Sequence, residues 1–211
     1  MLTYTKDINN EDILLDSNKE QVMMEWEKSY METCIDKLQP KGNVLEIGFG
    51  MGYSATAIQK YKPKSYTIIE CDPVVIEKCK EWAKDYNNVT IIEARWQEVI
   101  CTEKLGKYDE VFFDDFPNDI GTVSELEQFN INNRIHIFID LLCKYHLKSG
   151  SKISAYLCKN ETMYNDPKWK SKYIDNKKWK YDEEILSTKI SNIQNYHYSD
   201  NTAIVPLLTL V

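Results

Sequence analysis

The apolar residues of this chain fall into short continuous runs, separated by longer stretches with a helical period. Runs that predict buried strands lie at residues 44–47, 66–70, 89–92, 108–113 and 152–157. Helices are expected after the first run to about Lys60, from Pro73 onward and over residues 131–145. Strands that alternate with helices pair in parallel through right-handed crossovers. The pattern therefore predicts an α/β protein built on a parallel sheet.

The C-terminal part of the chain follows a weaker pattern. Residues 160–180 are expected to form an irregular surface region with a short helix. Tyr181 to Ile193 and Thr202 to Val211 each predict a further strand, and we expect these two to be antiparallel. With them the sheet would have seven strands, most of them parallel.

The N-terminal part places a charge where an apolar residue is expected. Residues 1–18 are polar with little periodicity, and they suit either a loosely ordered arm that closes over a site or a frayed terminus. A helix is predicted from Lys19 to Leu38, and Glu27 falls inside its apolar arc. Burying an unpaired carboxylate costs several kcal/mol. Glu27 therefore either meets a lysine or a backbone donor at the edge of that arc, or has a buried cationic partner.

The length and composition fit a single globular domain. A chain of 211 residues buries roughly 70% of the surface that its unfolded form exposes. We expect one domain over residues 1–211, with an N-terminal arm (1–18), a substrate-side helix (19–38), a cofactor-binding core (42–157) and a C-terminal region (158–211) that completes the sheet. No apolar run reaches the ~18 residues that span a bilayer, and the start carries no signal-peptide pattern, so a cytoplasmic location is expected.

The charge and the potential metal ligands argue against several partners. A formal net charge of −7 disfavours nucleic acid, which needs a basic footprint. Acids interleave with the lysines around Trp169 and Trp179, which favours a solvated face there. Six scattered cysteines and three isolated histidines predict neither a disulfide framework nor a metal site. A small or cationic substrate suits the acidic chain better.

The first apolar run leads into three closely spaced glycines, Gly48, Gly50 and Gly52. Glycines let a ligand approach the backbone where other residues would block it. A dinucleotide fingerprint would have its third glycine at Tyr53, and no Gly-Lys-Ser/Thr sequence of a P-loop is present. The loop therefore predicts a nucleotide-like ligand without a pyrophosphate cradle.

A carboxylate at the end of the next strand narrows the choice of ligand. Glu70 lies 20 residues after Gly50, a distance suited to accepting both ribose hydroxyls of an adenosine. Its alternative is a strand-terminal acid in solvent. In combination with Glu46 and the glycine spacing, Glu70 predicts S-adenosylmethionine as the cofactor.

Residues 46–52 resemble the first motif of Rossmann-like class I methyltransferases that use S-adenosylmethionine. More narrowly, the chain is similar to guanidinoacetate N-methyltransferase and its relatives, the arginine δ-N-methyltransferases. Residues 22–31 match the Val-Met-x-x-Trp-Glu-x-Pro-Tyr-Met helix of that family, residues 68–71 its ribose strand, residues 95–99 its adenine segment and residues 113–117 its Tyr-Asp-Thr-Tyr/Phe-Pro segment. Ser29 replaces the family's proline, and Asp115 replaces its threonine.

The resemblance implies a mostly parallel seven-stranded sheet flanked by helices, and a set of residues around the cofactor. The implied cofactor-binding residues are Met23, Met31, Glu46, Gly48, Phe49, Gly50, Met51, Gly52, Tyr53, Glu70, Cys71, Arg95, Trp96 and Asp114. Arg95 and Trp96 belong to the segment that packs on adenine in the family.

The resemblance also implies that Glu27 and Asp114 grip the guanidinium of the substrate. Two carboxylates suit the forked donors of a guanidinium, and a bound cation would offset the burial of Glu27. The attacking nitrogen must lose a proton, so we assign Asp114 as the base and Glu27 as the anchor, with exchanged roles as the alternative. Asp115 is either a third substrate-binding acid or a turn residue in solvent.

Three functions remain open from the sequence. The first is a guanidino N-methyltransferase acting on a small molecule such as guanidinoacetate. The second is a protein arginine or other amine methyltransferase. The third is a module that binds S-adenosylmethionine without catalysis, which the acids at positions 27, 70 and 114 disfavour.

Overall fold

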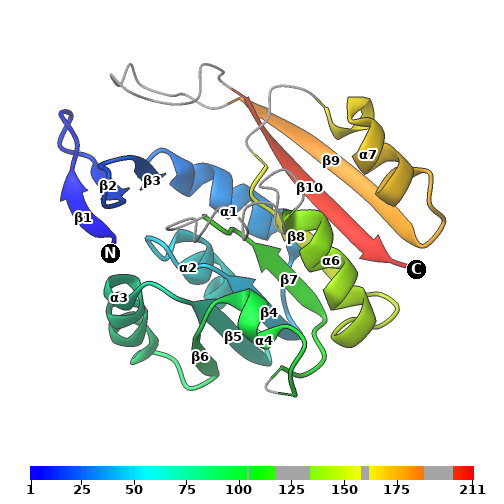
Figure 1. Ribbon diagram of the computed structural model, residues 1–211, viewed down its shortest axis with the longest axis horizontal. Coiled ribbons are helices and arrows are strands. Elements are labelled where there is room, and N and C mark those ends of the chain that lie inside the picture. Colours follow the sequence, from blue (N-terminus) through cyan, green and yellow to red (C-terminus); the bar gives the residue numbers. More distant parts are fainter. Residues whose placement is uncertain (104, 117–133, 158–161, 188–201) are drawn as a thin grey trace.

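The computed structural model describes residues 1–103, 105–116, 134–157, 162–187 and 202–211. Within these residues a seven-stranded sheet forms the centre, in the order β6-β5-β4-β7-β8-β10-β9 (Figure 1). Its strands are β4 (Asn43–Ile47), β5 (Ser65–Glu70), β6 (Val89–Glu93), β7 (Glu110–Phe113), β8 (Lys152–Ala155), β9 (Trp179–Ser187) and β10 (Thr202–Leu210). The first five strands in this order pair in parallel. Strand β10 is antiparallel to both β8 and β9, so the predicted mostly parallel sheet is confirmed.

Each face of the sheet packs against its own layer of helices, because successive strand residues point to opposite faces. Val44 and Phe112 pack with α1 (Glu27–Leu38), α2 (Tyr53–Lys60) and α3 (Pro73–Ala83) on one face. Leu45 and Val111 pack on the other face with α4 (Trp96–Val99) and α6 (Arg134–Tyr145). The same face is covered further along by η2 (Met163–Asn165), α7 (Pro167–Trp169) and η3 (Lys170–Ile174).

The strand order reverses between β4 and β7. Strands β5 and β6 continue from β4 on one side, whereas β8 follows β7 on the other. In open parallel sheets, ligands bind outside the carboxyl ends of the strands at such a switch point. Gly48 directly follows β4 and Asp114 directly follows β7, so both lie at this point.

The N-terminal residues form a sheet, which corrects two predictions. Strands β1 (Thr3–Lys6), β2 (Asp12–Leu15) and β3 (Gln21–Met24) make a three-stranded antiparallel sheet. The prediction of a loosely ordered arm over residues 1–18 is therefore wrong, and Leu14 in this sheet is completely buried. The predicted helix from Lys19 is also wrong in its first part, because α1 begins at Glu27. A short apolar run such as residues 22–24 fits a strand as well as a helix, and pairing with β2 decides between them.

The two C-terminal strands pair as predicted where the structure describes them, whereas the region before them is more ordered and more buried than predicted. Strand β9 is antiparallel to β10 as expected, although the predicted residues 188–193 lie outside the described residues, as do residues 131–133 of the predicted helix. In the region predicted to be irregular, Trp169 and Tyr173 are each 1% exposed and anchor α7 and η3 to the sheet.

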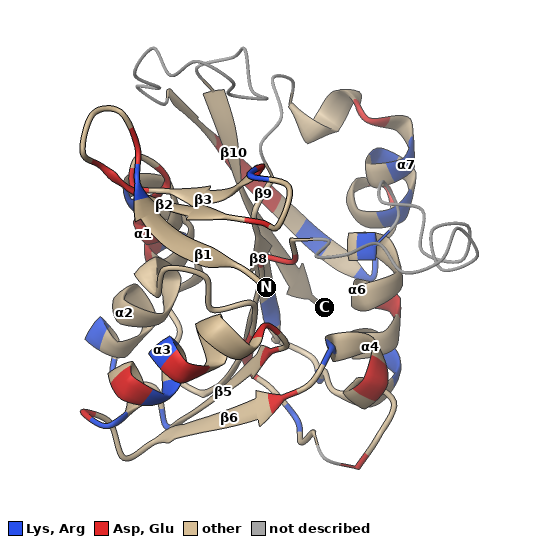
Figure 2. Ribbon diagram, turned by 60° about the vertical axis from the view of Figure 1, so that its left-hand side comes forward, with Lys and Arg blue, Asp and Glu red and all other residues tan. Residues whose placement is uncertain are grey.

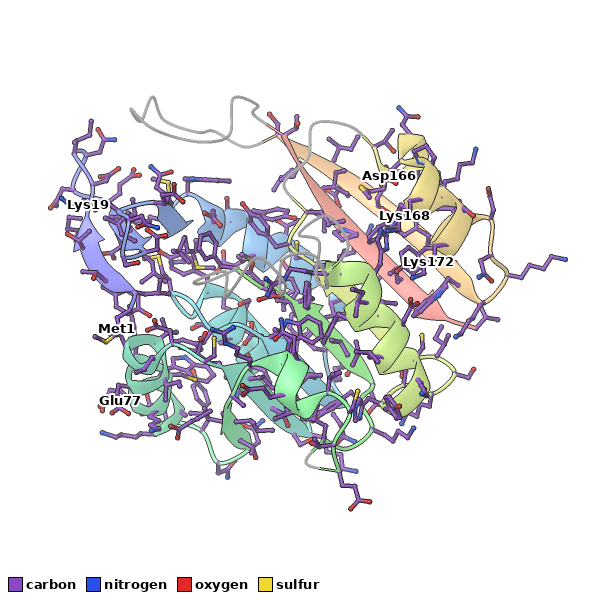
Figure 3. All side chains as sticks on the ribbon, in the orientation of Figure 1. Met1, Lys19, Glu77, Asp166, Lys168 and Lys172 are labelled. Carbon is purple, nitrogen blue, oxygen red and sulfur yellow. The ribbon has the colours of Figure 1, made fainter. Side chains whose placement is uncertain are left out.

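Charge is distributed unevenly over this fold. Figure 2 shows lysine and arginine positions around α6 and α7, and acidic positions in the loops of the three-stranded sheet. Figure 3 shows Lys168 and Lys172 on the side of the molecule opposite to Lys19. Lys172 pairs with Asp140 of α6. Among the described residues, no helix is both long and apolar enough to cross a membrane.

Candidate active site

The backbone of the glycine loop favours glycine at its three positions. Gly48, Gly50 and Gly52 have φ values of +81°, +51° and +76°, which side chains rarely allow. A Cβ atom on Gly48 would lie 2.2 Å from the backbone carbonyl oxygen of Asp114. The absence of a side chain at Gly48 therefore lets the segment after β7 approach the loop closely.

Glu70 fixes the other side of the loop. Its Oε2 accepts a hydrogen bond from the backbone N–H of Phe49 at 2.9 Å. Its Oε1 accepts from the N–H groups of Cys71 at 2.7 Å and Asp72 at 2.9 Å. Glu70 is only 7% exposed, so the alternative of an acid in solvent is wrong. Binding of ribose by Glu70 stays a prediction, and the side chain stands where the end of β5 meets the loop.

Glu46 lies beneath the loop and is completely buried. The Tyr66 hydroxyl donates a hydrogen bond to its Oε2, while its Oε1 has no partner among the described residues. Burial raises the pKa of Glu46 to about 8, with hydrogen bonds from Ser54 and Tyr66 opposing the rise and the charge of Asp114 adding to it. Contact of Glu46 with a cofactor stays a prediction, and its burial gives that contact no support.

The three-stranded sheet lies over the glycine loop. The Tyr4 hydroxyl donates to the Gly50 carbonyl oxygen at 2.6 Å, and the backbone N–H of Met51 donates to the sulfur of Met23 at 3.3 Å. The backbone N–H of Leu2 donates to Asp72 at 3.0 Å. Met23, predicted to bind the cofactor, thus touches the loop itself.

Glu27 is 5% exposed, as its place on the apolar arc predicts. It is the first residue of α1, and its Oε1 accepts from the backbone N–H of Met24 at 3.1 Å. Burial raises the pKa of Glu27 well above its ordinary value, and the nearby charge of Asp114 raises it further. Hydrogen bonds from Met24 and from the Tyr156 side chain act in the opposite direction. The expected backbone donor is therefore present, and Glu27 and Asp114 lie close enough for their charges to interact.

Asp114 is partly buried at the end of β7, and its backbone N–H donates to the Ile47 carbonyl oxygen at 3.1 Å. Burial raises the pKa of its carboxyl group to about 7, with further contributions from the charges of Asp115 and Glu70. A carboxyl group with a pKa near neutrality is suited to accept a proton.

Asp115 is paired within the protein and does not face solvent. Its Oδ2 accepts hydrogen bonds from Arg134 Nε and from Trp96 Nε1, each at 2.8 Å, and the Arg134 pair is a salt bridge. Asp115 therefore neither points into solvent nor stands as an unpaired third acid. Substrate binding by Asp115 remains a prediction, with its charge already balanced by Arg134.

The other predicted cofactor residues divide into exposed and buried ones. Cys71 and Arg95 are exposed at the carboxyl ends of β5 and β6. Trp96 is 3% exposed and packs edge-on against Phe138, which gives it a place in the core. Phe49 and Met31 are also core residues, while Met51 and Tyr53 are partly exposed at the loop and at the start of α2.

Sequence reasoning missed two contributors to this site, Arg134 and Tyr156. Arg134 opens α6 and pairs with Asp115. Tyr156 follows β8, and the parallel pairing of β7 with β8 was a signal that could have found it. A residue after β8 must lie next to the residue after β7, which is Asp114.

The fold and this arrangement of loop and carboxylates define the class of S-adenosylmethionine-dependent methyltransferases. Residues 3–201 match the family model described as guanidinoacetate N-methyltransferase. The chain belongs to this family.

The curated relatives carry a different name. Protein arginine N-methyltransferase 2 of Candida glabrata is 40% identical over 54% of this chain and 27% of its own length. The protein of the same name from Saccharomyces cerevisiae is 38% identical over 48% of this chain and 26% of its own length. The chain thus matches about a quarter of the length of these relatives.

Solved structures share the fold at low identity. The TYW2 protein of M. jannaschii in complex with AdoMet has a TM-score of 0.56 and 20% identity. The match covers 100% of this chain and 87% of that chain. The N-methyltransferase NodS of Bradyrhizobium japonicum has a TM-score of 0.59 and 12% identity, covering 88% of this chain and 96% of that chain. The predicted class I methyltransferase fold is confirmed.

Proposed function

We propose that this protein is an S-adenosylmethionine-dependent N-methyltransferase that acts on a guanidino nitrogen, with arginine residues of proteins as the first candidate substrate. The observation that carries the proposal is the pair of carboxylates, Glu27 and Asp114, beside the glycine loop. Burial and the charge of Asp114 raise the pKa of Glu27, and burial raises that of Asp114 to about 7. A guanidinium between them would relieve that repulsion and supply forked donors to both.

The residues around the loop suit the proposed cofactor. The glycines leave the backbone open, Glu70 at the end of β5 would accept the ribose hydroxyls, and the nearby acids would complement a positive sulfonium. When bound, S-adenosylmethionine supplies a methyl group on a positively charged sulfur. Glu27 then holds the guanidinium, and Asp114 accepts the proton that the attacking nitrogen loses as the new nitrogen–carbon bond replaces the carbon–sulfur bond. The methylated guanidinium keeps its charge, and the proton remains on Asp114 until it passes to water.

The choice between substrates rests on the relatives. The sequence alone favours a small guanidine as the substrate, whereas the curated relatives are named protein arginine N-methyltransferases and favour arginine residues of proteins. Guanidinoacetate remains the second candidate, because the family model carries its name.

A methyl-transfer screen tests this function. Labelled cofactor would be offered with arginine-containing proteins and peptides, free arginine, guanidinoacetate and simple amines. We expect transfer to a guanidino nitrogen, with loss of turnover in Asp114→Asn and unchanged turnover in the exposed control Asp182→Asn. Cofactor binding without transfer to any acceptor would refute the catalytic proposal. Transfer to amines alone would refute the guanidino substrate.

A further inference from the structure

We infer that Tyr156 forms the third wall of the guanidinium pocket, where its hydroxyl holds Glu27 and its ring stacks on the planar cation. The inference rests on the proposed function, because it concerns the substrate side of the same site. Strands β7 and β8 are parallel, with Phe113 opposite Ala155. The backbone N–H of Tyr156 donates to the Phe113 carbonyl oxygen at 2.9 Å. Tyr156 therefore stands beside Asp114 at the ends of two neighbouring strands.

The side chain of Tyr156 reaches across to a different element of the fold. It lies close enough to the carboxylate of Glu27, the first residue of α1, to lower the pKa of that group by hydrogen bonding. Glu27 also accepts from the backbone N–H of Met24 and faces the charge of Asp114. Tyr156 thus joins the two carboxylates that would bind the substrate, one through its side chain and one through its place in the sheet.

The ring of Tyr156 is held in position from one side. It meets the ring of Tyr30 edge-on, with centroids 5.4 Å apart and an angle of 74° between the planes. Tyr30 is itself completely buried, and its hydroxyl donates to the Ile204 carbonyl oxygen at 2.6 Å and accepts from the Leu157 N–H at 2.9 Å. The support behind Tyr156 is therefore rigid, while Tyr156 remains partly exposed.

An aromatic wall next to two carboxylates distinguishes a guanidinium from an ammonium ion. A guanidinium is planar and weakly hydrated, so it can stack on a tyrosine ring while its edges donate to carboxylates. An ammonium ion is compact and strongly hydrated, and it gains less from the ring. Tyr156 therefore favours guanidine over amine substrates in this pocket.

Two substitutions separate the roles of the hydroxyl and the ring. Tyr156→Phe removes only the hydroxyl, and we expect the KM for an arginine-containing peptide to rise about tenfold, with kcat changed less than about threefold. Tyr156→Leu also removes the ring, and we expect a further rise of about threefold. Affinity for the cofactor, measured by calorimetry, should stay within about twofold of wild type in both, since Tyr156 acts on the substrate side.

A matched control is provided by Tyr61→Phe. The Tyr61 hydroxyl donates to Asp36 on the same helix α1 at 2.8 Å, at an exposed site. This variant loses a tyrosine–carboxylate hydrogen bond outside the pocket, and we expect its kinetics to match wild type. An unchanged KM in Tyr156→Phe would overturn the role of the hydroxyl. Equal KM values in Tyr156→Phe and Tyr156→Leu would overturn the role of the ring.

A second readout does not depend on activity. The carboxyl carbon of Glu27 can be titrated by NMR in the ligand-free protein, with Glu27→Gln for its assignment. Loss of a hydrogen bond to the ionised form raises a pKa, so Tyr156→Phe should shift the midpoint upward by about one pH unit. An unmoved midpoint would overturn the contact. A wild-type protein that methylates no guanidine would refute the proposed function instead, and the titration would still decide whether Tyr156 holds Glu27.

Discussion

Replacing Glu46 with glutamine should change how the stability of the ligand-free protein depends on pH. Glu46 is completely buried, and its pKa is raised from 4.5 to about 8. Between these values the folded protein keeps the proton on Glu46 while the unfolded chain releases it. The free energy of unfolding therefore falls as the pH rises through this window, and levels off above about pH 8.

The size of the effect follows from the two pKa values. Their difference of about 3.5, at about 1.36 kcal/mol for each pH unit, corresponds to at most about 5 kcal/mol. In Glu46→Gln this contribution is absent, because the amide has no proton to lose. The variant should match wild type within about 1 kcal/mol at pH 5 and exceed it by several kcal/mol at pH 9.

Urea denaturation of both proteins at pH 5, 6, 7, 8 and 9 measures the difference. Asp114 and Glu27 titrate in the same direction but are present in both proteins, so the comparison isolates Glu46. Glu77→Gln, at a largely exposed surface position, serves as the control. Stability curves that run parallel across the whole range would refute the reasoning that burial holds the proton on Glu46.

Further predictions concern the glycine loop, the three-stranded sheet that lies over it, and the two carboxylates Asp114 and Glu27. Gly48→Ala should abolish cofactor binding in titration calorimetry, because its Cβ would meet the Asp114 carbonyl at 2.2 Å; wild-type affinity would contradict this. Tyr4→Phe loses the hydrogen bond from the three-stranded sheet to the glycine loop and should weaken cofactor binding about fivefold. Unchanged cofactor affinity would show that this hydrogen bond does not support the loop. In wild type, kcat/KM should rise with pH through a midpoint near the Asp114 pKa of about 7; a flat profile would exclude this base. Binding of a guanidinium should release protons, seen as buffer-dependent heat, since a cation lowers the raised pKa of Glu27; buffer-independent heat would argue against it.

The parallel core of the fold could be predicted from the sequence because its signals are local. A buried strand, a glycine turn and a helix succeed one another between residues 43 and 60, and each is encoded in adjacent residues. The three-stranded N-terminal sheet could not be predicted in this way. Its strands are four residues long, and β3 becomes a strand through pairing with β2 and packing on the loop.

The site residues likewise divide into those that local sequence signals predict and those that only the fold brings together. The positions of Glu27, Glu70 and Asp114 follow from helix periodicity and from the ends of strands. The partners of Asp115 do not, because Arg134 lies 19 residues away on another element and meets it only through the fold. Likewise, the influence of Tyr156 on the pKa of Glu27 depends on a proximity that the order of strands in the sheet creates.

Strand β9 has a consequence for the behaviour of the protein at high concentration. It lies at the edge of the sheet, pairs with β10 alone among the described residues, and is nine residues long. Long open edges offer unpaired backbone groups to other molecules and promote aggregation. Here Lys180, Asp182, Glu183 and Glu184 occupy the strand, and such charges disfavour edge-to-edge association. The charges of this strand thus oppose association at the sheet edge, which β10 and β8 separate from the site at the end of β7.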